Sequence, residues 1–240
     1  MSLHSRKPIV TIDGPAGVGK STVTRQVAQT LGLLYLDTGA MYRAFTWLVL
    51  HKGIATDDEK AIATLVEQCQ IQLTTSNNPQ FPTLVWIDNH DVTPVIRTPA
   101  VTAYVATIAA QPAVRCALVN QQRRYGLNGG LIAEGRDLGT HVFPDAEVKI
   151  FLTASIQERA RRRLRELQEQ GLERLSLEEL EQAIIERDWM DISRAIAPLR
   201  PAKDAIVLCT DGLSVAEVTE QVVDLYQHRT NSFPARRLLI

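Results

Sequence analysis

The chain has 240 residues, in which 26 Lys and Arg face 27 Asp and Glu, for a formal net charge of −1 at pH 7. This balance argues against nucleic acid or membrane as a partner bound through overall charge, while it allows local basic clusters. The three cysteines, Cys69, Cys116 and Cys209, have neither a disulfide framework nor a zinc-ligand spacing. Residues 2–7 lack a leader pattern and no run of about 20 apolar residues occurs, so we expect a cytoplasmic protein.

A glycine-rich segment follows the first apolar run of the chain. Ile9 to Ile12 predicts a buried strand, and Ser21 to Leu31 has the apolar spacing of a helix. Between them lies the pattern G-x-x-x-x-G-K-[ST], which is typical of a phosphate-binding loop built from backbone N–H groups at a helix start. Lys20 is expected at the β- and γ-phosphates of a nucleotide, and Ser21 as a Mg²⁺ ligand. The residues predicted to hold the nucleotide in this loop are Gly14, Pro15, Ala16, Gly17, Val18, Gly19, Lys20, Ser21 and Thr22.

The second apolar run, Leu33 to Leu36, leads through polar residues into a helix. Asp37 and Thr38 would lie at the carboxyl end of this strand, where open α/β sheets bind ligands. Arg43 would follow about one turn along the helix and face the same cleft. In the alternative interpretation, Asp37 only caps the helix and Arg43 is a surface charge.

A long insert then separates the second strand from the third. Within it, 71–75 and 84–88 have the composition of strands, with a hairpin tip predicted at Asn89–His90. Helices are predicted near 98–109 and over 112–125. We therefore expect the insert to carry a small antiparallel sheet of its own.

The third apolar run, Leu131 to Ala133, ends in Glu134, and Arg136 and Asp137 follow within a glycine-containing turn. An acid in this position beside a phosphate-binding loop usually holds Mg²⁺ or its water shell. The flanking glycines also suit a simple β-turn without a ligand.

A predicted helix over 155–170 follows the fourth apolar run, 148–152. It carries five arginines in seven positions, and Gly171 ends it. We expect Arg159 and Arg163 to face the nucleotide and the other three to be solvated.

A second helix is predicted over 176–193, with a capping box at Ser176–Glu179. Near its end, Arg187, Asp191 and Arg194 are spaced i, i+4 and i+7, which would place them on one face. Such a stripe could form one wall of an anion site, or it could be a solvated ladder of salt bridges.

With the last run, 205–209, five apolar segments alternate with helical patterns. Because the runs are almost continuously apolar, we expect strands buried on both faces of a parallel sheet. The predicted fold class is α/β: a P-loop NTPase three-layer sandwich with a five-stranded parallel sheet, an insert and a helical lid. A guanine switch is disfavoured, because it needs an N-K-x-D segment and no Lys in this chain follows an Asn.

Together, five motifs between the first strand and about residue 223 resemble the bacterial cytidylate kinases of the nucleoside monophosphate kinase superfamily. They are the glycine-rich loop, Asp-Thr-Gly-Ala-Met-Tyr-Arg, Gly-Arg-Asp-Leu-Gly-Thr with Val-Phe-Pro-Asp-Ala, Glu-Arg-Asp, and 194–205. The resemblance implies transfer of a phosphoryl group from ATP to CMP and dCMP, with Mg²⁺, in a monomer that binds neither nucleic acid nor membrane. Two alternatives stay open: a kinase for another small acceptor such as UMP, dTMP or shikimate, and a non-catalytic ATP-binding module.

The resemblance also implies roles for individual residues. The acceptor phosphate would contact Thr38, Arg43, Arg136 and Arg187; the ribose would contact Asp191 with Arg187; cytosine would contact Arg115 and Asp137; and Asp37 and Arg194 would complete the substrate site. Lys20, Arg136 and Arg187 are the predicted catalytic residues, and Ser21 and Glu134 the predicted metal ligands.

Two positions depart from the family pattern. Ala106 stands where the family usually has a Ser that helps to hold the base, and Glu134 stands where many relatives have Asp. The implied domains are a kinase core of 1–41, 110–155 and 195–240, a monophosphate-binding insert of 42–109 and a lid region of 156–194.

Overall fold

The computed structural model describes residues 7–76, 78, 81–169, 171 and 175–231. The chain forms two compact units, which are described separately. Unit 1 comprises residues 1–35 and 126–240, and unit 2 comprises residues 36–125. This grouping differs from the predicted core, insert and lid mainly at 36–41 and 110–125, which belong to unit 2. The polar N-terminal residues before Lys7 lie outside the described residues.

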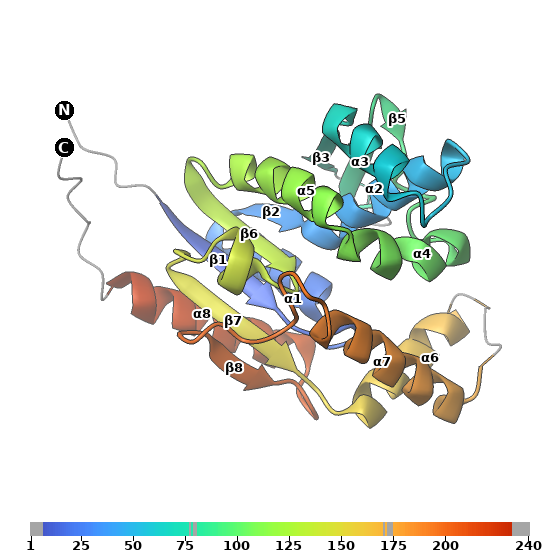
Figure 1. Cartoon of the computed structure of the whole chain (residues 1–240). Coiled ribbons are helices and arrows are strands. Elements are labelled where there is room, and N and C mark those ends of the chain that lie inside the picture. Colours follow the sequence, from blue (N-terminus) through green and yellow to red (C-terminus); the bar gives the residue numbers. More distant parts are fainter. Residues whose placement is uncertain (1–6, 77, 79–80, 170, 172–174, 232–240) are drawn as a thin grey trace, which may run out of the picture. The chain divides into compact units, whose positions relative to one another are not determined.

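Unit 1 is built on a five-stranded parallel sheet with the order β2-β6-β1-β7-β8 (Figure 1). Its strands are β1 (Lys7–Asp13), β2 (Leu34–Asp37), β6 (Gly129–Gly135), β7 (Val148–Thr153) and β8 (Ile206–Cys209). The last two residues of β2 are the first two of unit 2. The last five residues of β1 are all buried, as expected of a central strand covered on both faces. The α/β fold class and the five strands predicted from the apolar runs are confirmed.

Two helices, α1 (Lys20–Leu31) and α8 (Val215–Asn231), pack side by side against the sheet of unit 1. The core joins buried valines of both helices to apolar residues of the central strands: Val23, Val27, Val218, Val222, Val10, Ile12, Ile132, Val148, Ile150 and Leu152. Full burial of such a side chain contributes about 1.5–3 kcal/mol. This packing holds the start of α1, and with it the glycine-rich loop, at the carboxyl end of β1.

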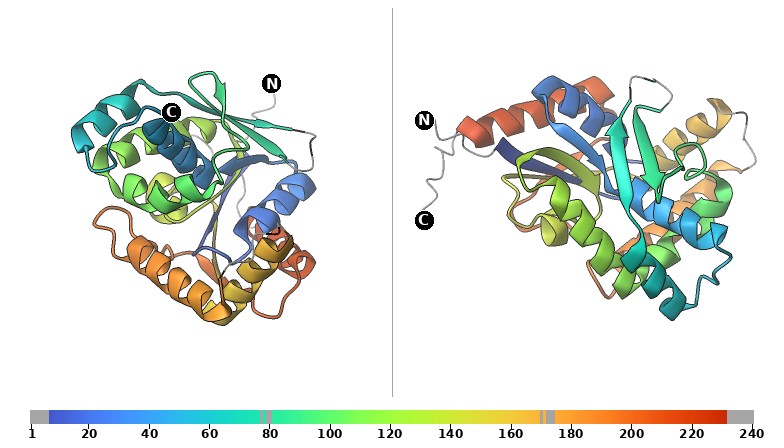
Figure 2. Two further views of the ribbon diagram at one scale, coloured as in Figure 1. Left: turned by 90° about the vertical axis from the view of Figure 1, so that its right-hand side faces the viewer. Right: turned by 90° about the horizontal axis from the view of Figure 1, so that it is seen from above.

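Two further helices of unit 1, α6 (Ile156–Glu169) and α7 (Leu177–Ile192), are neighbours and are drawn in yellow to orange (Figure 2). α7 begins with the predicted capping box. The Ser176 hydroxyl accepts the N–H of Glu179, and the Glu179 carboxylate accepts the N–H of Ser176. Both predicted helices are confirmed to within one residue at their described ends, while residues 170 and 172–174 lie outside the described part of the chain.

Unit 2 combines helices with a small antiparallel sheet in the order β3-β4-β5. Its elements are α2 (Thr38–His51), α3 (Glu59–Gln68), β3 (Ile71–Thr75), β4 (Thr83–Ile87), β5 (His90–Asp91), α4 (Pro99–Ala110) and α5 (Pro112–Tyr125). The predicted small sheet and the two predicted helices at its end are confirmed, whereas α3 was not predicted.

The turn between β4 and β5 lies one residue earlier than predicted. Asp88 and Asn89 have φ values of 46° and 68°, and His90 already pairs with Ile87. A two-residue hairpin turn of this hand needs positive φ at both central positions, which Asp and Asn readily adopt. The predicted tip at Asn89–His90 is therefore wrong.

Side chains of α5 cover the outer edge of β3. Gln121 Oε1 accepts the N–H of Ile71 at 3.1 Å, and the Tyr125 hydroxyl accepts the N–H of Leu73 at 3.1 Å. An edge strand with open N–H groups is a template for pairing with other chains. These two bonds remove that template within unit 2.

In the described part of the chain, no single helix is both long and apolar enough to cross a membrane. α4 and α5 meet the requirement only as a pair, with a bend of 95° between them, and buried core helices of other proteins meet it as well.

Gly14 provides a test of the close approach between the glycine-rich loop and β7. Its φ is 146°, and an added Cβ would lie 2.2 Å from the carbonyl oxygen of Leu152. We expect Gly14→Ala to lower the free energy of unfolding by about 3 kcal/mol or more, measured by urea denaturation. The control is Gly32→Ala, which has a φ of 61° but no atom within 4 Å of the added Cβ; it should cost only about 1 kcal/mol. Equal losses in the two variants would contradict the steric argument.

Candidate active site

The glycine-rich loop turns from β1 into α1 through three glycines with positive φ: 146° at Gly14, 79° at Gly17 and 89° at Gly19. Gly19 is the N-cap of α1, whose first N–H groups have no acceptor within the helix itself. A helix start of this kind, preceded by residues of unusual φ, is a binding site for anions. The backbone thus has the conformation that the sequence pattern predicts.

Lys20 is the first residue of α1 and is buried, with 6% of its surface exposed. Its ammonium group donates a hydrogen bond of 2.6 Å to the carbonyl oxygen of Pro15 in the same loop. Burial and the positive charge of Arg136 hold the pKa of Lys20 well below its usual value, while nearby carboxylates oppose the shift. A bound anion would favour the charged form of this side chain.

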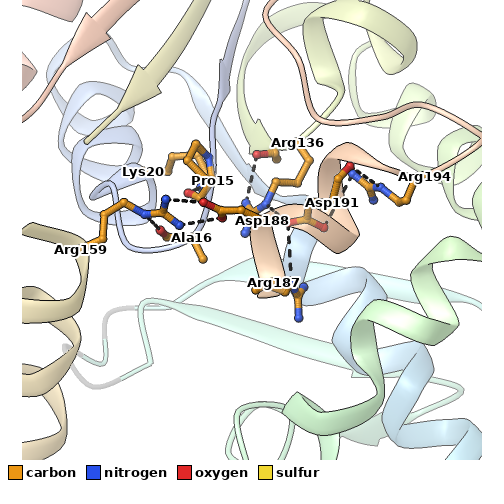
Figure 3. Close-up of polar contacts among 10 residues, drawn as sticks. Pro15, Ala16, Lys20, Arg136, Arg159, Arg187, Asp188, Asp191 and Arg194 are labelled. Atoms are coloured by element: carbon orange, nitrogen blue, oxygen red, sulfur yellow. Dashed lines mark hydrogen bonds and ion pairs between the residues drawn. The ribbon is translucent and has the colours of Figure 1, made fainter. Parts of the chain in front are cut away.

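Arg159 reaches the loop from α6 (Figure 3). Its Nε donates to the carbonyl oxygen of Ala16 at 2.6 Å, and its two terminal nitrogens donate to the carboxylate of Asp188 at 2.5 and 2.7 Å. Only 2% of Arg159 is exposed. Asp188 of α7 therefore holds the planar guanidinium group against the phosphate-binding loop.

The other arginines of α6 have different partners. Arg163 pairs with Glu166 at 3.0 Å, and 48% of its side chain is exposed. Arg162, which was expected to be solvated, donates to the carbonyl oxygen of Thr210 at 2.7 Å and to its hydroxyl at 3.0 Å. A contact of Arg163 with the nucleotide stays a prediction.

Ser21 and Glu134, the two predicted magnesium ligands, are in direct contact. The Ser21 hydroxyl donates to one carboxylate oxygen of Glu134 at 2.8 Å, and the hydroxyl of Tyr35 donates to the other. Hydroxyl and carboxylate oxygens suit Mg²⁺, which uses few protein ligands and keeps several waters. The pair fits this ion, and among the described residues no cluster of three or more His, Cys, Asp or Glu suggests a different metal.

Asp191, near the end of α7, gathers three arginines (Figure 3). Its carboxylate lies 3.0 Å from Nε of Arg136, 3.7 Å from Nε of Arg187 and 3.9 Å from Nη2 of Arg194. The Asp191 side chain is 6% exposed, so the interpretation as a solvated ladder is wrong. Burial opposes ionisation of this carboxyl group, but the three guanidinium groups outweigh burial and hold its pKa below the usual value.

Asp13, at the end of β1, is a buried acid that the sequence analysis did not single out. Its carboxylate accepts the N–H of Leu138 at 2.9 Å and that of Gly139 at 2.8 Å. These residues begin η1 (Leu138–Val142), a single π-helical turn directly after Asp137, so a simple β-turn does not describe this segment. Burial raises the pKa of Asp13 to about 6, although the two hydrogen bonds act in the opposite direction.

In unit 2, Asp37 is the N-cap of α2. One carboxylate oxygen accepts the N–H of Ala40 at 2.9 Å, and the other pairs with Arg97 at 3.1 Å, which supports the capping alternative. Arg43, further along α2, donates to the hydroxyl of Thr102 at 2.9 Å and is thus held within the unit. Ligand roles for Asp37 and Arg43 stay predictions.

Arg115 of α5 is fully buried in unit 2. Its Nη1 donates to the carbonyl oxygen of Ala109 at 3.3 Å, and its guanidinium carbon lies 5.6 Å from the ring centroid of Tyr42, within range of a cation–π contact. Thr38, the first residue of α2, is buried as well. Ala106 is half-buried on α4, where it presents a methyl group instead of the hydroxyl implied by the resemblance.

Unit 2 also has an open surface groove of about 780 Å³ between α5 and residues 66–72. None of the predicted site residues lines it. The candidate site is therefore defined by its loop and charged side chains and not by this groove.

The structure thus assembles most of the predicted site within unit 1. Lys20, Ser21, Glu134, Arg136, Asp137, Arg159, Arg187, Asp191 and Arg194 belong to this unit, and Asp37, Thr38, Arg43 and Arg115 belong to unit 2. Sequence reasoning missed Asp13, Tyr35 and Asp188. Tyr35 lies within a predicted strand, Asp13 directly follows one, and Asp188 lies within the Glu-Arg-Asp motif. A polar residue at such a position was the sequence feature that could have identified them as site residues.

A phosphate-binding loop at the end of a central parallel strand, with one buried and three half-buried arginines in the same unit, defines a P-loop α/β protein with a site for anionic ligands. A family model described as cytidylate kinase matches residues 10–228. The chain belongs to the cytidylate kinase family.

Curated relatives are similar over nearly the whole chain. A bifunctional pantoate ligase/cytidylate kinase of Nostoc sp. is 62% identical over 231 residues, which cover 96% of this chain and 43% of that protein. The protein of the same name from Synechocystis sp. is 57% identical over 225 residues, covering 94% and 44%. The chain therefore spans less than half the length of these relatives. Among solved structures, shikimate kinase from Acinetobacter baumannii, in complex with shikimate, is 13% identical with a TM-score of 0.45, covering 96% of this chain and 97% of that chain.

The buried carboxyl group of Asp13 predicts a pH dependence of stability. Because folding raises its pKa from 3.8 to about 6, the folded protein holds this proton more tightly than the unfolded chain. The resulting stabilisation is complete at low pH and is lost as the pH rises through 6. Relative to Asp13→Asn, which does not titrate, we expect the wild-type free energy of unfolding to fall by about 1 kcal/mol between pH 5 and pH 7. Urea denaturation at both pH values measures this, and equal changes in the two proteins would refute it.

Proposed function

We propose that this chain transfers the γ-phosphoryl group of ATP to the 5′-phosphate of CMP or dCMP, giving ADP and CDP or dCDP. The main support is the group of three arginines that pair with Asp191 in the same unit as the phosphate-binding loop. Because the acceptor is already an anion, the reaction needs alignment and charge neutralisation more than a strong base. Membership of the cytidylate kinase family supports a cytidine nucleotide as the acceptor.

On the donor side, Lys20 and Arg159 are two cations that touch the loop. Each is bonded to a loop carbonyl oxygen, that of Pro15 for Lys20 and that of Ala16 for Arg159. A phosphate oxygen is a stronger acceptor than a carbonyl oxygen because it is charged. We infer that the ATP phosphates replace Pro15 as the partner of Lys20, while Asp188 keeps the Arg159 guanidinium in place.

Ser21 and Glu134 would hold Mg²⁺ beside the loop, and their contact of 2.8 Å supports this assignment. When bound, the ion supplies positive charge to the β- and γ-phosphate oxygens. Glu134 is longer than the Asp of many relatives, and the hydroxyl of Tyr35 orients its carboxylate.

On the acceptor side, Arg136, Arg187 and Arg194 carry three positive charges around the single negative charge of Asp191. The net charge of about +2 matches a phosphate dianion, and the planar guanidinium groups suit its oxygens. Asp191 reduces the repulsion among the arginines and fixes their direction before the substrate binds. Thr38 and Arg43 of unit 2 would complete the phosphate contacts.

Recognition of cytosine is assigned to Arg115 and Asp137. A carboxylate accepts the exocyclic amine of cytosine, and a guanidinium donates to its ring acceptors. Uracil has a carbonyl oxygen in place of this amine, and that oxygen would face the carboxylate without a hydrogen bond. Because both side chains are buried, the unpaired polar groups would be costly. Ala106 adds no hydroxyl, so selectivity would depend on these two residues.

The α6–α7 pair would act as a lid that excludes water, which otherwise competes as the acceptor. We propose a cytoplasmic monomer in pyrimidine nucleotide metabolism.

Lys20→Ala tests the donor site. We expect turnover to fall by about 100-fold or more with the circular dichroism spectrum unchanged, because the ammonium group that neutralises the ATP phosphates is lost. Wild-type turnover in this variant would contradict the mechanism.

In an ADP-release assay with CMP, dCMP, UMP, dTMP and shikimate, the wild type should prefer the first two. Preference for another acceptor would favour a different small-molecule kinase, and no ADP with any acceptor would favour a non-catalytic ATP-binding module.

Arg187→Ala tests the acceptor site. We expect the KM for CMP to rise by about 10-fold or more, with a smaller effect on the KM for ATP, because a charged contact to the acceptor is lost. Arg161→Ala is the matched control, since Arg161 is an arginine of α6 with 59% of its side chain exposed. Equal increases for both nucleotides would contradict the assignment of Arg187.

A further inference from the structure

Asp13 connects β1 to the segment after β6 through both its backbone and its side chain. In the sheet, Asp13 pairs with Gly135, the last residue of β6. Its carboxylate then accepts the N–H groups of residues 138 and 139, at 2.9 and 2.8 Å. The Arg136–Asp137 segment lies between these contacts. Asp13 therefore fixes the chain both before and after this segment.

The chain that follows this segment is also closely held. The carbonyl oxygen of Asp137 accepts the N–H of His141 at 2.8 Å, within the π-helical turn. A Cβ added to Gly139 would lie 3.2 Å from Oγ1 of Thr11 and 3.3 Å from Cδ of Lys149, closer than ordinary contacts. The backbone at Gly139 thus leaves little room for a displacement toward these side chains.

Each of the two N–H groups has its own carboxylate oxygen: Oδ1 accepts that of Leu138, and Oδ2 accepts that of Gly139. The Asp13 side chain is buried, with 4% of the residue exposed, so bulk water does not take over its role. Asn in its place offers one carbonyl oxygen, and its NH₂ group would face the second N–H. Burial makes the ionised carboxylate costly, as its raised pKa indicates, and such a cost is typical of a group kept for geometry.

We propose that Asp13 is a positioning residue for the acceptor nucleotide, which fixes the direction of Arg136 and Asp137 without touching the nucleotide. In this arrangement Arg136 reaches Asp191 at 3.0 Å and joins the arginine cluster. The identity of the acceptor rests on the proposed function, whereas the two hydrogen bonds can be tested without it.

The first test is Asp13→Asn, which keeps the size of the side chain and removes one acceptor. We expect kcat/KM for CMP to fall roughly 10- to 100-fold, with the KM for ATP changed by less than about threefold. Asp58→Asn is the matched control, because the Asp58 carboxylate accepts the N–H of Ala61 at an exposed helix start; it should stay within about twofold of wild type. Losses of similar size for CMP and ATP would mean a general disturbance of the loop and would overturn the proposal.

A double-mutant cycle separates positioning from stability. If Asp13 acts through Arg136, the Asp13→Asn/Arg136→Ala variant should lose little more CMP activity than Arg136→Ala alone. A cycle with Arg43→Ala, in unit 2, should instead give losses that multiply. Multiplying losses in the Arg136 cycle would overturn the proposal.

A measurement without catalysis completes the test. Asp13→Asn should speed hydrogen exchange at the amides of Leu138 and Gly139 by about 10-fold relative to other amides of unit 1. Unchanged exchange would overturn the positioning role, even if no monophosphate proved to be an acceptor and the proposed function failed. If Asp13→Asn does not fold, Gly139→Ala displaces the same segment from its other side and should give the same CMP-selective loss. CMP kinetics like those of the wild type in that variant would again overturn the proposal.

Discussion

Unit 1 must keep several cations close together before any phosphate arrives, and the rest of the site is arranged around this constraint. Two like charges 4 Å apart near a protein surface repel by about 4 kcal/mol. The negative charge of Asp191 offsets this repulsion among Arg136, Arg187 and Arg194. Asp188 offsets the charge of Arg159 in the same way, by accepting hydrogen bonds from both of its terminal nitrogens. Both acids belong to α7, so the position of one helix determines the electrostatics of the site. Buried ion pairs contribute little to stability, which suggests that function explains their presence.

The features that could be predicted from the sequence depend on residues a few positions apart. The glycine-rich loop, the capping box at Ser176–Glu179 and the buried strands each follow from local spacing and side-chain chemistry. The contact between Ser21 and Glu134 was also predictable. Glu134 lies at the carboxyl end of β6, and Ser21 lies just beyond the loop that leaves the carboxyl end of β1. The carboxyl ends of parallel strands share one edge of the sheet. Local spacing and the geometry of parallel sheets therefore predict that this edge of the sheet binds phosphate groups.

The missed features depend on partners that are distant in sequence. Asp13 binds residues 125 and 126 positions away, and Tyr35 binds Glu134 from 99 positions away. No local pattern specifies such pairs, because the sheet order brings them together. For Arg159, the charge at the loop was predictable but its partner Asp188 was not, since the angle between two helices is set by packing. The turn at Asp88 was misplaced because adjacent polar residues suit the same turn positions.

The order of the strands along the chain also has a consequence for synthesis on the ribosome. β1 is the central strand, yet Lys7 pairs with Gly129 and Val10 with Val148, so its neighbours are made only after all of unit 2. Unit 2, by contrast, contains every strand of its own three-stranded sheet within residues 36–125. Unit 2 can therefore be completed on the ribosome while β1, an apolar segment, is still without hydrogen-bonding neighbours. That exposed strand is where a chaperone would bind and where premature aggregation would begin.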